Sequence, residues 1–158
     1  MRSAGRGFTL IELVITVAIV ALLAAAAVPV ADLVVQRARE LELQRALRQI
    51  RDGIDAYKQA SDEGRIAKNV GDSGYPKRLE ELVDGVDDSK SPKREKIYFL
   101  RRIPRDPLNP DATLPSAGTW GKRSYASPPD DPREGDDVYD VYSLDTGRGI
   151  NGRPYREW

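Results

Sequence analysis

An apolar run near the N-terminus constrains this chain more than any other feature. From Leu13 to Ala31 there are 19 residues without a charged side chain, and only Thr16 and Pro29 fall outside the hydrophobic class. A helix rises about 1.5 Å per residue, so the run spans about 28 Å, close to the ~30 Å hydrocarbon core of a bilayer. A soluble core could bury such a helix, but a chain of 158 residues has too little other apolar surface to surround it. The run therefore predicts a membrane-spanning helix.

Two other interpretations of this run remain open. A secretory signal peptide would have a shorter apolar stretch of about 7–15 residues and then a cleavage site of small residues, which Ala24–Ala27 could supply. A plain signal anchor would keep Arg2 and Arg6 on the cytoplasmic side and the rest of the chain outside. Neither explains Glu12, because a carboxylate in a membrane span costs up to about 2.5–3.5 kcal/mol at the bilayer centre. Glu12 is either tolerated at the headgroup level or paired with a cation.

Composition excludes several classes of function. The chain has 25 Lys and Arg against 25 Asp and Glu, and this zero net charge argues against a general nucleic-acid binder. It has no cysteine, which excludes disulfides, thiolate catalysis and Cys-ligated zinc. It has no histidine either, which excludes Ser-His-Asp triads and histidine metal sites. No spacing of carboxylates supports a membrane-tethered hydrolase, and we expect no enzyme.

The residues before the apolar run carry a specific pattern. A short basic leader ends at Gly7, and Phe8 is followed by Thr-Leu-Ile and Glu12. This order resembles the processing site of type IV pilins and of the pseudopilins of type II secretion. The resemblance implies that a prepilin peptidase cleaves between Gly7 and Phe8 and methylates the new amine of Phe8. Pro29 strengthens the resemblance, since that family usually has a helix-bending proline at this distance from the cleavage site.

The resemblance also suggests a partner for Glu12. The amine of Phe8 is a cation near the membrane, and Glu12 is an anion four residues further on. In a filament, Glu12 of one subunit would reach the terminal amine of its neighbour. Two charges that are each unfavourable in lipid become less so when they are paired. We therefore expect Phe8, Glu12 and Pro29 to act in assembly, with the chain forming a homo-polymer.

The chain continues as an amphipathic helix, which we predict over residues 32–60. Apolar residues recur at spacings of 4, 3, 4 and 3, which places them on one helix face for burial, namely Leu43, Leu47, Ile50, Ile54 and Tyr57. Charged residues occupy the rest of this helix, namely Arg37, Arg39, Glu40, Arg45, Arg48, Arg51 and Asp52, and the basic ones among them are expected to form a solvated face. The domain boundaries that follow are a leader at 1–7, a transmembrane and polymerisation helix at 8–31, this helix at 32–60, and a periplasmic variable region at 61–158.

The variable region predicts an α+β fold with few regular elements. A short helix is expected over Pro76–Val83, and strands over Lys122–Ala126 and Asp137–Leu144. The segment Lys96–Ile103 is ambiguous between strand and helix. Two or three short antiparallel strands laid on the long helix would complete its core, with a long C-terminal loop, as in the pilin fold.

Further residues resemble the major pseudopilin of type II secretion. In chain order they are Tyr75-Pro76 with Leu79 and Leu82, then Ile103–Pro107, Trp120-Gly121 and Asp140–Ser143. The resemblance implies a single-pass protein of the bacterial inner membrane with a periplasmic C-terminal domain, whose filament supports protein export. Its implied partners are membrane lipid, the prepilin peptidase, minor pseudopilins and an assembly platform with its ATPase. The alternatives are a type IV pilus subunit and, in a different class, an anchored calcium- or ligand-binding domain that does not polymerise.

An acidic stretch suggests a calcium site. Seven acids lie between Asp130 and Asp145, and glycines follow in the next turn. Ca²⁺ takes 6–8 oxygen ligands from carboxylates and carbonyls, and major pseudopilins bind calcium in the corresponding loop. The resemblance implies Asp140, Ser143, Asp145 and Asn151 as ligands, although the loop here is shorter than is usual in that family. The alternative is a solvated acidic loop without a metal.

Overall fold

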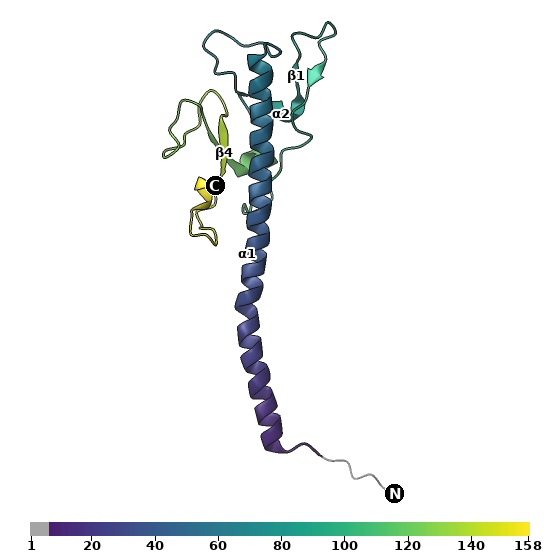
Figure 1. The fold of residues 1–158 in the computed structure, drawn as a ribbon, viewed down its shortest axis with the longest axis vertical. Coiled ribbons are helices and arrows are strands. Elements are labelled where there is room, and N and C mark those ends of the chain that lie inside the picture. The colour runs from purple at the N-terminus through teal and green to yellow at the C-terminus, as the bar shows by residue number, and fades with distance from the viewer. Residues whose placement is uncertain (1–6) are drawn as a thin grey trace. The chain divides into compact units, whose positions relative to one another are not determined.

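The structure is a computed structural model that describes residues 7–158, without the side chains of 26–31. Its longest element is helix α1, Leu10–Asp62, which has 53 residues. The chain divides into two compact units between Ala38 and Arg39. Helix α1 contributes to both units, and all other helices and strands of the described residues belong to the second unit (Figure 1). The predicted leader 1–7 lies outside the described residues except for Gly7.

The first unit consists of the N-terminal part of α1. The described side chains from Gly7 to Ala25 are all exposed, among them Phe8 at 80% and Leu10 at 83%. Over the described residues, which leave out the side chains of 26–31, no helix combines the length and the apolar character of a membrane span. Over residues 8–25 the unit therefore presents an exposed, largely apolar helix surface that no described residue covers.

The second unit is built on the stripe that helical spacing predicts. Leu43, Ile50 and Ile54 are fully buried and Leu47 is 2% exposed, so the predicted buried face of α1 is confirmed. Their partners come from distant segments and include Leu79, Leu82, Trp120 and Val141. The core forms where α1 meets the chain that returns over it, because no other element is long enough to bury apolar surface alone.

A small helix and a hairpin follow α1. Helix α2 is Glu81–Asp84, and strands β1, Val86–Asp87, and β2, Lys96–Ile97, pair antiparallel. The predicted helix over Pro76–Val83 is therefore wrong in extent. Residues 77–80 form bends and turns instead, and the carbonyl of Pro76 accepts a hydrogen bond from the amide of the distant Val138. Of the ambiguous segment Lys96–Ile103, only β2 is regular.

The second sheet lies near the C-terminus. Strands β3, Trp120–Arg123, and β4, Asp140–Ser143, pair antiparallel with Trp120 opposite Ser143 and Arg123 opposite Asp140. Both predicted strands are confirmed in position, but β3 begins earlier and both are shorter than predicted. The chain leaves β3 at Ser124, whose hydroxyl donates to Asp137 at 2.8 Å and whose amide bonds outside the ladder.

Two 3₁₀ turns complete the unit. The first, η1, is Ser116–Thr119 and leads directly into β3, and the second, η2, is Tyr155–Glu157 at the end of the chain. A bridge between Arg148 and Pro154 closes the last loop before η2. The observed α+β architecture of a long helix with two small antiparallel sheets agrees with the expected fold class and is compatible with a pilin fold.

Candidate processing and assembly site

Helix α1 begins with a capping box. The amide of Glu12 donates to the Thr9 hydroxyl at 3.3 Å, and the amide of Thr9 donates to the Glu12 carboxylate at 3.4 Å. This reciprocal pair satisfies two amides at the start of a helix that would otherwise lack partners. The carboxylate also lies at the positive end of the helix dipole, where a negative charge is favourable.

The capping box gives Glu12 a local role that the sequence analysis did not assign. Glu12 is exposed, and the carboxylate bonds the Thr9 amide through one oxygen, Oε2. The sequence signal was present, since Thr or Ser followed by Glu three residues later before an apolar run is the capping-box pattern. A test of a charge-pairing role for Glu12 must therefore separate its charge from its hydrogen bond to Thr9.

The predicted cleavage site lies in exposed chain before the helix. Residues 7–9 are not helical, and α1 begins at Leu10. A Cβ atom added at Gly7 would have no described heavy atom within 4 Å. Nothing in the described structure requires glycine at position 7, so the fold does not explain this residue.

Pro29 lies within the range of α1, whose bounds include it. Its side chain belongs to residues 26–31, which are outside the described side chains. The predicted bend or local melting at Pro29 therefore stays a prediction.

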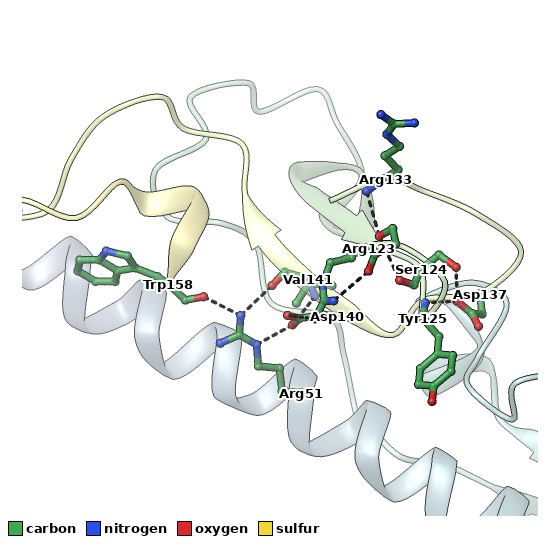
Figure 2. Close-up of polar contacts among 10 residues, drawn as sticks. Arg51, Arg123, Ser124, Tyr125, Arg133, Asp137, Asp140, Val141 and Trp158 are labelled. Atoms are coloured by element: carbon green, nitrogen blue, oxygen red, sulfur yellow. Dashed lines mark hydrogen bonds and ion pairs between the residues drawn. The ribbon is translucent and has the colours of Figure 1, made fainter. Parts of the chain in front are cut away.

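The first predicted calcium ligand is already paired with cations. Arg51 Nε donates to Asp140 Oδ1 at 2.8 Å, and Arg123 Nη2 approaches Asp140 Oδ2 at 3.4 Å (Figure 2). Asp140 and Ser143 are three residues apart on β4, so their side chains point to opposite faces of the strand. The structure therefore does not bring these two predicted ligands together.

The other predicted ligands accept hydrogen bonds from backbone amides of nearby turns. The Ser143 hydroxyl accepts from the amide of Asp145, and Asp145 Oδ1 accepts from the amide of Gly147 at 2.7 Å. Asn151 Oδ1 accepts from the amide of Arg153 at 3.0 Å. Among the residues that the structure describes, no three acidic side chains are close enough to hold a metal ion. The calcium site stays a prediction.

Ser143 instead belongs to a buried polar cluster that the sequence did not reveal. Its hydroxyl donates at 2.6 Å to Asp106, which is 2% exposed. Asp106 also accepts from the amide of Leu108 at 2.8 Å. Desolvation by burial raises the pKa of the Asp106 carboxyl, and the charge of Asp145 raises it further against the opposing hydrogen bonds. No periodicity marks an aspartate between two prolines as buried.

Two charged residues of α1, Glu40 and Arg51, are not fully solvated. Glu40 is buried, and its Oε1 accepts from the Tyr155 hydroxyl and from the amide of Ile150, both at 2.9 Å. Arg51 donates from Nη2 to the carbonyls of Val141 and Trp158, besides its ion pair with Asp140 (Figure 2). The prediction of a solvated basic face is wrong for Arg51, and the sequence analysis did not foresee the burial of Glu40, because the partners of both residues come from the far end of the chain.

Comparison with known proteins addresses the N-terminus alone. Residues 2–28 match the family described as the prokaryotic N-terminal methylation motif. The chain thus carries a prepilin-like signal, which supports the pilin family and fits a type IV pilin-like subunit that a prepilin peptidase processes and that polymerises. The signal also indicates a membrane-anchored protein. No curated protein and no solved structure matches the chain.

Proposed function

We propose that this protein is a structural, non-enzymatic subunit of a type II secretion pseudopilus. A prepilin peptidase cleaves after Gly7, Phe8 becomes the methylated N-terminus, and the mature chain polymerises through its N-terminal helix to support export of folded proteins. The observation that carries the proposal is a prepilin signal placed on an exposed apolar helix that begins immediately after the cleavage site.

Gly7 supports the processing step. A Cβ atom at this position would contact no described heavy atom, and the open, non-helical segment leaves the Gly7–Phe8 bond accessible. A residue that the fold does not require, at the position where the family is cleaved, fits recognition by a peptidase. The exposed apolar side chains of α1 support the assembly step, because such a surface needs lipid or neighbouring chains to cover it.

The proposal extends to location and partners. The N-terminal helix anchors the subunit once in the inner membrane, and the second unit and the assembled filament occupy the periplasm. Minor pseudopilins, an assembly platform and its ATPase complete the system. The resemblance of Ile103–Pro107 and Trp120-Gly121 to the major pseudopilin favours this branch over a type IV pilus subunit. An anchored calcium- or ligand-binding domain is the alternative in a different class.

The mass of the mature N-terminus tests the proposal. The full chain is expressed with its prepilin peptidase, recovered from membranes and analysed by intact-mass and N-terminal peptide measurement. We expect a chain that begins at methylated Phe8, and filaments visible by electron microscopy when the assembly machinery is present. A chain that keeps Met1 and forms no polymer would contradict the proposal and favour the anchored domain.

A pair of variants separates the two roles of Glu12. Glu12→Gln keeps a side-chain acceptor for the Thr9 amide but removes the charge, whereas Thr9→Ala removes the cap and keeps the charge. If Glu12 pairs with a neighbour's amine, Glu12→Gln is processed normally and loses filaments, and Thr9→Ala keeps most of them. Equal filament yields from Glu12→Gln and the wild type would show that Glu12 acts only as a cap.

A further inference from the structure

A pocket rich in arginine lies between α1 and the last segment of the chain. It has a volume of about 190 Å³ and is lined by Gln44, Leu47, Arg48, Arg51, Asn151, Arg153 and Trp158. Gln44, Arg48 and Arg51 are spaced four and three residues apart, so they share one face of α1. Three arginines line this small hollow, and arginine donates hydrogen bonds in a fork that fits carboxylates.

The three arginines differ in the hydrogen bonds and ion pairs that they make within the chain. Arg51 is committed to Asp140 and to the carbonyls of Val141 and Trp158, and Arg153 donates weakly to the Glu157 carbonyl at 3.4 Å. Arg48 is exposed and makes no hydrogen bond or ion pair with any described residue. The pocket therefore has donors to spare.

The same unit presents the complementary charge elsewhere. The loop between β3 and β4 carries exposed acids at Asp130, Asp131, Glu134 and Asp136. Asp131 pairs with Arg133 and Glu134 lies 3.8 Å from Lys122, but Asp130 and Asp136 make no ion pair with any described residue. This acidic loop enters β4 at Asp140, whereas the segment that lines the pocket leaves β4 after Ser143 (Figure 1). The two charged surfaces therefore involve segments that flank β4 on its two sides in the sequence.

We propose that the arginine pocket receives the acidic loop of a second copy of this chain. The two surfaces differ, so the contact is head-to-tail, and a contact of this kind extends from copy to copy without closing on a dimer. Charge complementarity sets the orientation and disfavours other registers. The inference rests on the proposed function, since it names a contact between globular units in the filament that is separate from the N-terminal helix.

Cysteine crosslinking of the full-length chain tests the contact. Because the protein has no cysteine, two differently tagged variants, Arg48→Cys and Asp136→Cys, provide one thiol each. They are coexpressed with the assembly machinery and oxidised in the membrane. We expect a disulfide-linked dimer that carries both tags. The matched control is Arg45→Cys with Asp136→Cys, since Arg45 is exposed on the same helix but does not line the pocket. It should crosslink far less.

Charge reversal provides a second test of the contact. Arg48→Glu should lower filament yield by roughly tenfold through like-charge contact, and the added change Asp136→Arg should restore much of it. An unchanged melting temperature of Arg48→Glu shows that the unit still folds. Normal filaments without the crosslink or the charge effect would overturn the contact and leave the proposed function standing. An unprocessed chain without filaments would overturn both.

Discussion

At the scale of single residues, Glu40 and Arg51 join the end of the chain to α1. Glu40 is 7% exposed and accepts from Tyr155 and from the backbone of Ile150, while Arg51 binds two carbonyls and the Asp140 carboxylate. A buried charge is unfavourable unless hydrogen bonds replace its water. Both side chains meet that condition, so they hold the last segment over the buried stripe.

Removing one of these hydrogen bonds should measurably destabilise the second unit. Tyr155→Phe deletes the hydroxyl that donates to Glu40 at 2.9 Å and keeps the ring that packs on Trp158. We expect a loss of about 1.5–3 kcal/mol in the free energy of unfolding, as for hydrogen bonds to charged groups. Denaturant titration measures it, and Tyr98→Phe is the matched control because Tyr98 is exposed. A loss no greater than that of the control would contradict this role.

The buried Asp106 should make stability depend on pH. Its folded pKa is raised above the ordinary 3.8 chiefly by desolvation, so the native state binds its proton more tightly than the unfolded chain does. Its contribution to stability is therefore greatest when the carboxyl is protonated, and it falls as pH rises through the raised folded pKa. Above that pKa the native state holds a buried anion.

The variant Asp106→Asn isolates this effect. The free energy of unfolding of the variant, relative to wild type, should increase as pH rises from about 4 toward 7, because other carboxylates titrate equally in both proteins. Urea titrations at several pH values measure the difference. A pH-independent difference would show that Asp106 titrates alike in the folded and unfolded states.

At the scale of elements, β3 and β4 meet through a glycine and an aromatic ring. Gly121 lies opposite Tyr142, and a Cβ atom at Gly121 would collide with the Tyr142 ring. The ring fills the space that the missing side chain leaves. This close approach explains why a residue with poor strand propensity lies within β3.

The variant Gly121→Ala should therefore destabilise the second sheet. The ring of Tyr142 must move, which lowers the melting temperature. The double variant Gly121→Ala with Tyr142→Ala should lose less unfolding free energy than the sum of the losses of the two single variants. A coupling of about 0.5–3 kcal/mol is expected for residues in contact. Gly118→Ala is the control, since its nearest contact would be an ordinary 3.4 Å to Pro115. Additive effects would contradict the packing argument.

The elements also show what the sequence could and could not reveal. The stripe from Leu43 to Tyr57 was predictable, because helical spacing depends only on local residues. The prepilin signal was predictable as a linear pattern. The start of α2 and the burial of Asp106 were not, since they depend on partners such as Val138 and Ser143 that are distant in sequence. The place of Asp140 between two arginines was hidden for the same reason.

At the scale of the whole molecule, the two units differ in what they can bury. Every described core residue lies at or after Leu43, and the polar contacts at Glu40 also fall within the second unit. The described apolar side chains of the first unit contribute nothing to that core. Among the described residues, those that form the core of the second unit therefore all lie within 39–158.

A chain that begins at Arg39 should fold without the first unit. It keeps Glu40 and the whole buried stripe, so we expect a soluble protein with one cooperative thermal transition. A chain that begins at Arg48 is the control, because it lacks Glu40, Leu43 and Leu47, and the loss of two buried leucines costs about 2–5 kcal/mol each. That deficit approaches the whole stability of a small domain, so the shorter chain should not unfold cooperatively. Circular dichroism melts of both chains measure this, and a chain from Arg39 without a cooperative transition would show that the core needs residues of the first unit.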